Sequence, residues 1–180
     1  VHEGMRVVDA CAGAGGKTLH LAALMKNKGQ IIALDIYEWK LAELKRRAKR
    51  AGAHNIETRF IEDNKVIKRL HEKADRLLID APCSGLGVLK RNPDSKWKID
   101  QDFIDRIKNE QQQILQDYSK MLKKGGKMVY ATCSILPSEN NEQVETFLKN
   151  NEGFTLLKEE KVMPSDGFDG FYMALIQRNA

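Results

Sequence analysis

The sequence lacks the features that mark membrane and secreted proteins. No apolar run approaches the roughly 20 residues that a membrane-spanning helix needs, and the polar start Val1–Gly4 does not resemble a signal peptide. Only three cysteines occur, and an odd, sparse set is not a disulfide framework. No CxxC or CxxH pair indicates a metal site. We therefore expect a cytoplasmic protein with no metal and no membrane association.

The composition that remains is typical of a globular protein. Hydrophobic residues make up 42% and charged residues 31% of the 180-residue chain. This length suits a single domain, residues 1–180, which can bury a core without disulfide support.

The net charge of +5 is unevenly distributed. Residues 36–50 are basic, as are residues 90–98, whereas residues 138–160 are net acidic. The cations of the second basic segment are Lys90, Arg91, Lys96 and Lys98, and Trp97 lies among them. The first segment fits a solvated helix face equally well. The second follows directly on a candidate active-site motif, so it is the stronger indication of a polyanionic partner.

Strand-like and helix-like segments alternate along the chain. The predicted strands are Arg6–Ala10, Gln30–Asp35, Glu57–Ile61, Asp75–Ile79, Lys127–Thr132, Phe154–Lys158 and Phe171–Gln177. The predicted helices are residues 17–26, 38–51, 64–71, 101–122 and 138–150, and residues 80–99 are expected to form a loop. Gly52 and the pair Gly125-Gly126 are expected to end the helices that precede them. This alternation predicts an α/β fold with a mostly parallel sheet and helices on both faces, which binds ligands beyond the carboxyl ends of its strands.

A glycine-rich loop joins the first predicted strand to the first helix. It reads Cys11-Ala12-Gly13-Ala14-Gly15-Gly16-Lys17. Glycines let the backbone approach a ligand closely, and the helix start supplies free amides. A phosphate-binding P-loop needs glycine where Cys11 stands, and a dinucleotide fingerprint needs one where Thr18 stands. The loop is therefore not a standard phosphate cradle.

Two aspartates follow the next two strands. Asp35 ends the second strand, where an acid would accept hydrogen bonds from ribose hydroxyls, and Asp63, just after the third strand, could touch an adenine edge. Together with the loop they indicate a nucleoside cofactor without a pyrophosphate, which S-adenosylmethionine satisfies. The alternative is a tight turn and two helix-capping aspartates.

Cysteines stand at the ends of two further strands. The fourth strand runs into Asp80-Ala81-Pro82-Cys83-Ser84-Gly85, and the fifth into Thr132-Cys133-Ser134. A cysteine at the mouth of a cofactor cleft is a candidate nucleophile. The alternative for either one is a structural thiol.

These motifs resemble those of the RNA (cytosine-5) methyltransferases, the Sun/Fmu and nucleolar Nol/Nop family, and above all its bacterial members that act on 16S ribosomal RNA. The resemblance covers nearly the whole chain and rests on CAGAGGKT, Asp35, Asp63, DAPCSGLGVLKRNPDSKW, ATCSILPSENNEQV and DGFYMA. One departure is Gly13-Ala14, where the family usually has Ala-Pro. Without the proline the unbound loop has more conformational freedom, which raises the free-energy cost of ordering it by up to about 1 kcal/mol.

The resemblance implies a class I methyltransferase (Rossmann-like) fold with a seven-stranded sheet, in which Phe171–Gln177 is an antiparallel strand inserted near the edge. It also implies a binding site for S-adenosylmethionine. The residues expected there are Cys11, Ala12, Gly13, Ala14, Gly15, Gly16, Lys17, Asp35, Asp63 and Asp80.

The family chemistry assigns roles to four side chains. Cys133 would attack carbon 6 of cytosine, and Cys83 would assist release of the product. Asp80 would hydrogen-bond the cytosine ring, and Lys17 would be an electrostatic aid. The partner would be RNA, most simply ribosomal RNA, with the target base turned out of its stack.

Two alternatives remain open from the sequence. The first is an RNA-binding assembly factor that keeps the fold without catalysis, which the intact Cys83 and Cys133 disfavour. The second is a dehydrogenase, which the missing third glycine disfavours. Family members often carry a further RNA-binding module. None is visible in these 180 residues, so the resemblance implies that such a module would belong to a longer chain.

Overall fold

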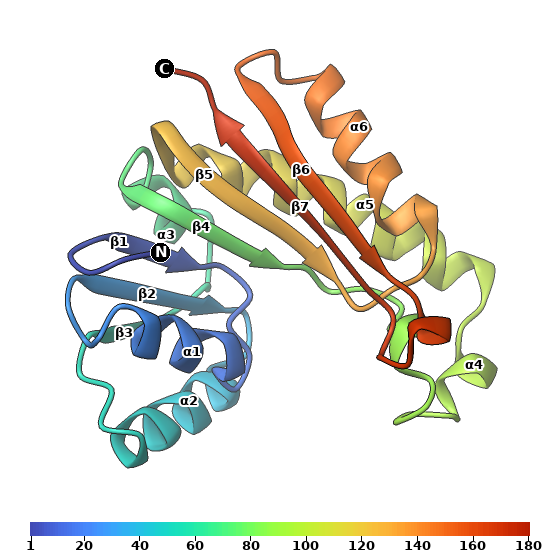
Figure 1. Ribbon diagram of the computed structural model, residues 1–180, viewed down its shortest axis with the longest axis horizontal. Helices are drawn as coiled ribbons and strands as arrows, with labels where there is room; N and C mark the ends of the chain where they lie inside the picture. The colour runs from blue at the N-terminus through green and yellow to red at the C-terminus, as the bar shows by residue number, and fades with distance from the viewer.

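The computed structural model, which describes residues 1–180, is built around one twisted seven-stranded sheet (Figure 1). The strands are β1 (Arg6–Asp9), β2 (Gln30–Asp35), β3 (Ile56–Phe60), β4 (Ala74–Asp80), β5 (Leu122–Thr132), β6 (Phe154–Val162) and β7 (Phe171–Arg178). Their order across the sheet is β3-β2-β1-β4-β5-β7-β6. All neighbours are parallel except that β7 is antiparallel to both β5 and β6. The mostly parallel sheet and the inserted antiparallel strand are thus confirmed.

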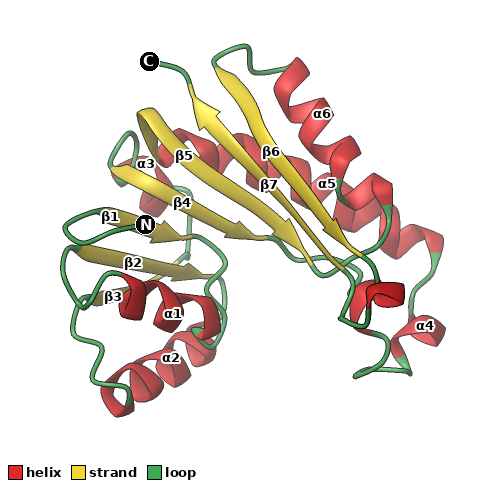
Figure 2. Ribbon diagram, viewed as in Figure 1, coloured by secondary structure: helices red, strands yellow, loops and turns green.

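Helices cover both faces of the sheet (Figure 2). They are α1 (Gly16–Leu24), α2 (Glu38–Arg50), α3 (Lys65–Arg69), α4 (Ser95–Lys98), α5 (Gln101–Tyr118) and α6 (Asn141–Lys149). α1 and α2 lie against β1, β2 and β3 on one face, whereas α3, α5 and α6 lie on the other. No helix is both long enough and apolar enough to cross a membrane.

The larger hydrophobic core lies between the sheet and the face that carries α3, α5 and α6. Alternate strand residues point into it because successive side chains of a strand face opposite sides. The central strands contribute Val8, Ile32, Ile79, Tyr130 and Ile176, all with at most 2% of their surface exposed. Two smaller clusters lie under α1 and α2. The sheet is therefore held from both faces, and its carboxyl edge is free for a site.

The long predicted helix ends earlier than we expected. α5 stops at Tyr118, a 3-10 turn covers Ser119–Met121, and β5 begins at Leu122. The glycine pair Gly125-Gly126 therefore does not end the helix but lies inside β5. The pairing partners of β4 jump there from Leu122 to Lys127, so the intervening residues bulge out of the ladder.

The bulge explains why glycines are needed at this point. Gly125 has a φ of +72°, and a side-chain carbon at Gly126 would lie 2.8 Å from the Lys123 carbonyl oxygen. By contrast, Gly52 follows the C-terminus of α2 with a φ of +64°, as predicted for a helix end. The predicted loop 80–99 contains a 3-10 turn, Leu86–Val88, as well as the short helix α4.

Candidate active site

The carboxyl ends of β1, β2 and β4 meet α5 around a cavity of about 440 Å³. The cavity extends from Asp35 at one end to Cys83 at the other, and Asp80 lies between them. One face of α5 forms the opposite wall, through Phe103, Ile107, Glu110, Ile114 and Tyr118. The volume is in the range of small-molecule sites, with a few polar groups on mainly apolar walls. No group of three or more His, Cys, Asp or Glu side chains is arranged to hold a metal ion.

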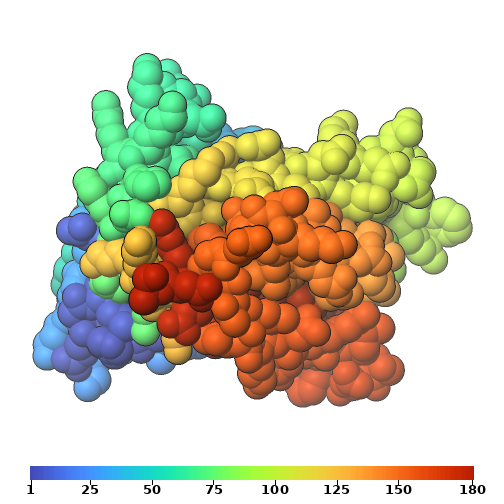
Figure 3. Space-filling model, turned by 90° about the horizontal axis from the view of Figure 1, so that it is seen from above, coloured from blue at the N-terminus to red at the C-terminus, as the bar shows by residue number.

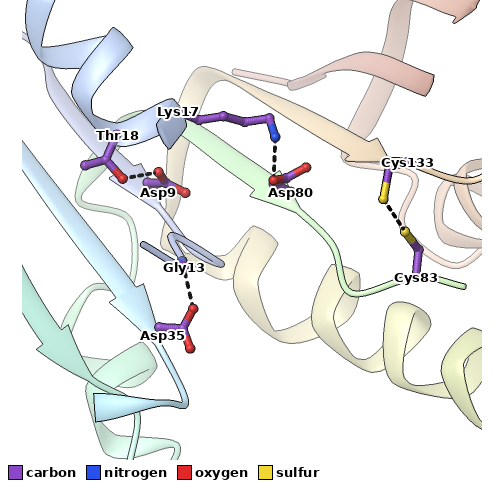
Figure 4. A network of polar contacts seen from close by, with 8 residues as sticks. All are labelled: Asp9, Gly13, Lys17, Thr18, Asp35, Asp80, Cys83 and Cys133. Atoms are coloured by element: carbon purple, nitrogen blue, oxygen red, sulfur yellow. Dashed lines mark hydrogen bonds and ion pairs between the residues drawn. The ribbon is translucent and has the colours of Figure 1, made fainter. Parts of the chain in front are cut away.

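Asp35 holds the glycine loop at the cavity. Its Oδ2 accepts a hydrogen bond from the Gly13 amide at 2.8 Å (Figure 4). Its Oδ1 accepts one from the Tyr37 amide at 2.8 Å. A carboxylate has about four acceptor sites, so Asp35 keeps free lone pairs for a ligand hydroxyl. The residues present therefore fit a ribose at this end of the cavity.

The rest of the loop is shaped by α2. Gly15 has a φ of +86°, and a side-chain carbon there would lie 2.5 Å from Leu44 Cγ. Arg47 Nη1 donates to the Ala14 carbonyl oxygen at 2.8 Å. Among the predicted loop residues, Cys11 and Gly13 line the cavity, whereas Ala12, Ala14, Gly15, Gly16 and Lys17 are not part of its walls.

Asp9, to which the sequence analysis assigned no role, lies directly beneath the loop. It is 1% exposed, and its Oδ2 accepts a hydrogen bond from Thr18 Oγ1 at 2.6 Å. Its Oδ1 is buried without a partner. Burial raises the pKa of Asp9 to about 6, although the bond from Thr18 opposes this. In the sequence, only its position at the end of a buried strand could have indicated that Asp9 is buried beneath the loop.

Lys17 and Asp80, for which the family resemblance implies separate roles, are in contact. Lys17 Nζ lies 2.6 Å from Asp80 Oδ2, and the ammonium lies over the Phe171 ring at 5.4 Å from its centre. Asp80 lines the cavity and is partly exposed, so the ion pair lies at the rim of the site.

The two candidate nucleophiles touch each other. Cys83 Sγ and Cys133 Sγ are 3.3 Å apart, and Cys83 lines the cavity. The hydrogen bond from Cys83 is the main reason that the pKa of Cys133 is lowered, and Lys17 adds to it. The same bond, with burial, raises the pKa of Cys83. Of the two, Cys133 therefore ionises first and Cys83 keeps its proton.

Cys11 differs from this pair. Burial and the charges of Asp9, Asp35 and Asp80 raise its pKa well above that of an ordinary thiol. It therefore remains a neutral thiol in the wall of the cavity and is not a candidate nucleophile.

Asp63 lies outside the cavity. It is exposed, its Oδ1 accepts a hydrogen bond from the Lys65 amide at 2.8 Å, and its side chain pairs with Lys65 Nζ at 3.1 Å. These contacts are those of a residue at a helix start. Its predicted contact with adenine stays a prediction.

Comparisons with known proteins identify the family to which the chain is similar. A family model described as 16S rRNA methyltransferase RsmB/F matches residues 1–177. A probable ribosomal RNA small subunit methyltransferase B of Bacillus subtilis strain 168 is 40% identical over 149 residues, which are 82% of this chain and 33% of that protein. The ribosomal RNA small subunit methyltransferase B of Yersinia enterocolitica is 38% identical over 188 residues, covering 98% of this chain and 43% of that protein.

Solved structures agree. A structure of NSun6 from Pyrococcus horikoshii with SFG, an S-adenosylmethionine analogue, superimposes with a TM-score of 0.90 and 29% identity. The match covers 100% of this chain and 49% of that one. The chain thus spans less than half the length of each of these three proteins.

Proposed function

The chain belongs to the 16S rRNA methyltransferase RsmB/F family, and from this premise we propose that it methylates carbon 5 of a cytosine in ribosomal RNA. The contact between two thiols, of which Cys83 lines one end of the cavity and Cys133 lies behind it, carries the proposal. A catalytically inactive assembly factor would need neither the contact nor the lowered pKa of Cys133.

S-adenosylmethionine is the proposed methyl donor, and it supplies an electrophilic methyl group when bound. Asp35 would accept hydrogen bonds from its ribose, and the apolar face of α5 would cover its base. The NSun6 structure with SFG supports the same class of cofactor. This geometry leaves the Cys83 end of the cavity for the target base.

Cys133 is the proposed nucleophile. Its thiolate attacks carbon 6 of the cytosine ring, and the electron pair of the 5,6 double bond moves to carbon 5, which then takes the methyl group. The carbon-5 proton passes to solvent water, and its bonding pair re-forms the 5,6 double bond. The bond between carbon 6 and sulfur breaks at the same time, and its electron pair leaves with Cys133 as a thiolate. The covalent step is needed because carbon 5 of cytosine is a poor nucleophile.

The neighbouring groups would act on this sequence of steps. Cys83 keeps its proton, so it can donate a hydrogen bond to the departing Cys133 sulfur and stabilise the thiolate. Asp80, held by Lys17 at 2.6 Å, would accept a hydrogen bond from the cytosine amino group. Their places beside the cavity support the roles that the family resemblance implies.

The test separates the two cysteines. With 16S ribosomal RNA and S-adenosylmethionine, Cys133→Ala should neither methylate nor form a covalent adduct. Cys83→Ala should instead accumulate the adduct as a shifted band on a denaturing gel, because attack is intact and release is impaired.

The opposite pattern of bands would show that the two roles are reversed. Variants that both methylate without any adduct would refute the covalent mechanism. A folded parent chain that binds RNA but methylates none would favour an assembly factor.

A further inference from the structure

A fully buried carboxylate lies behind the two cysteines. Glu139 is 0% exposed and ends the 3-10 turn Pro137–Glu139, between β5 and α6. Its Oε1 accepts hydrogen bonds from Ser84 Oγ at 2.5 Å and Ser134 Oγ at 2.6 Å. Its Oε2 accepts bonds from the Ser84 amide at 2.8 Å and Gln111 Nε2 at 3.0 Å. Four donors from three segments of the chain therefore converge on one side chain.

The two serines directly follow the two cysteines. Ser84 comes after Cys83, and Ser134 comes after Cys133, 50 residues further along the chain. One carboxylate thus joins the two loops that carry the thiols. Gln111 adds to this because its Nε2 also donates to the Pro82 carbonyl oxygen at 2.9 Å.

Glu139 has no cationic partner, since no Lys or Arg forms an ion pair with it. Removing a carboxylate from water costs free energy, whereas burying an apolar side chain does not. Hydrogen bonds to the buried oxygens offset this cost. Both carboxylate oxygens have two donors each, although Gln111 Oε1 in the same network is buried without a partner. A well-satisfied buried network fixes one arrangement of the segments that it joins. Here it fixes the position of the loop that carries Cys83 relative to the loop that carries Cys133.

We propose that Glu139 is a positioning residue, which holds the Cys83 and Cys133 loops at the separation that brings the two sulfur atoms into contact. This inference rests on the proposed function for its catalytic meaning, but the contact itself is a property of the free protein. The two loops also touch directly, because the Gly87 amide, four residues after Cys83, donates to the Cys133 carbonyl oxygen at 2.9 Å. Glu139 and Gln111 hold the part of the Cys83 loop that lies nearest to its sulfur atom.

The consequence is chemical as well as structural. The charged or titratable groups that act on Cys133 are Cys83, Asp80 and Lys17, and the charge of Glu139 acts on the pair through Cys83, whose pKa it raises. Among them the hydrogen bond from Cys83 lowers the pKa of Cys133 most. If the loops lose their alignment, that bond lengthens and the pKa of Cys133 should rise.

The experiment measures Cys133 alkylation by iodoacetamide against pH, with mass spectrometry, on the full chain without RNA or cofactor. Glu139→Gln keeps the side-chain volume but replaces one acceptor oxygen by a donor. Its alkylation midpoint should move to higher pH, and its rate at pH 7 should fall about threefold or more because less thiolate is present. Glu142→Gln, the same change at an exposed position of α6, should leave both unchanged.

A double-mutant comparison tests the route of the effect. Cys83→Ala should raise the Cys133 midpoint by itself, and adding Glu139→Gln should raise it little further, because both changes remove the same contact. A midpoint unchanged by Glu139→Gln, with only a lower melting temperature, would overturn the proposal. So would a second full shift in the double variant.

Two smaller changes keep the test decisive if Glu139→Gln does not fold. Ser84→Ala and Ser134→Ala each remove one hydroxyl from the carboxylate, and both should shift the midpoint upward by a lesser amount. No shift in either would also overturn the proposal. Because the assay needs no methyl transfer, its result is independent of whether the proposed function holds.

Discussion

Single residues at the site differ in how their buried charge is satisfied. Glu139 has four donors, whereas Asp9 has one donor and an oxygen without any partner. The two carboxylates are equally buried, so hydrogen bonding and not exposure separates them. The poorly satisfied one should make stability depend on pH.

Asp9 should make the folded protein less stable as the pH rises. Its pKa is about 6 in the folded state against 3.8 for an ordinary Asp, so between these values the folded state binds more protons than the unfolded state. The unfolding free energy of the parent should therefore fall by about 2–3 kcal/mol between pH 4 and pH 7, relative to Asp9→Asn. Urea unfolding of both proteins across this range measures the difference.

The comparison with Asp9→Asn cancels the other carboxylates, most of which contribute the opposite slope through their ion pairs. Parallel curves for the two proteins would show that the pKa of Asp9 is the same in the folded and unfolded states, and would contradict the prediction. The asparagine can still accept the Thr18 bond, so the variant keeps that contact.

At the scale of elements, the segment between β4 and α5 is fixed at its base and exposed at its tip. The Gly170 amide donates to the Gly87 carbonyl oxygen at 2.7 Å, and a side-chain carbon at Gly87 would lie 2.1 Å from the Gly170 oxygen. Further out, Trp97 is 80% exposed, and Phe168, in the neighbouring loop between β6 and β7, is 72% exposed. Figure 3 shows the segment that leads into α5, in yellow-green, at one end of the molecule.

This segment is the proposed contact for the RNA backbone. Lys90→Glu should weaken binding of a 16S ribosomal RNA fragment and lower the slope of log affinity against log salt by about 1 or more, because each phosphate contact releases a counterion. S-adenosylmethionine affinity should stay the same. Filter binding at several salt concentrations provides the measurement.

Lys90 is a cleaner test than Arg91, whose guanidinium pairs with Asp169 at 2.7 Å. Lys124→Glu is the matched control, since Lys124 is exposed near the amino end of β5, away from the carboxyl edge of the sheet. Equal losses for the two variants would indicate only a general effect of net charge.

At the scale of the whole molecule, the cavity joins parts that the sheet brings together. Its walls come from the ends of β1, β2 and β4 and from α5, so a ligand there contacts segments that are far apart in the sequence. A ligand that binds only the folded state stabilises it by mass action. Cofactor identity is therefore measurable as a change in thermal stability.

S-adenosylmethionine at about 100 times its Kd should add about 2.7 kcal/mol, which corresponds to roughly 5–10 °C for a chain of this size. Asp35→Ala should weaken binding by about 1–3 kcal/mol and reduce the shift, because groups paired with the carboxylate lose their partner. Asp63→Ala in the same assay tests its predicted adenine contact. A shift with NAD and none with S-adenosylmethionine would favour a dehydrogenase.

The fold was largely predictable from the sequence because its signals are local. Alternating apolar strands and amphipathic helices indicate a parallel sheet, and Asp35, Asp80, Cys83 and Cys133 each stand at or just after the end of a strand. Parallel strands end at one edge, so their meeting there could be expected. The antiparallel place of Phe171–Gln177 came from the family resemblance.

The error at Gly125-Gly126 also has a local origin. A glycine pair after an amphipathic segment is typical of a helix end, yet here it serves a bulge whose partner strand lies about 50 residues earlier. Pairing with β4 therefore decides where α5 gives way to β5.

By itself the sequence determined which residues stand at the carboxyl edge, because strand ends depend on neighbouring residues. The tertiary structure alone decided that Glu139 is buried, since an acid before a helix ordinarily faces water. It also decided that the two sulfurs are 3.3 Å apart, a contact that lowers the pKa of Cys133 and raises that of Cys83. Those properties depend on donors and charges from distant segments, which only the folded sheet brings together.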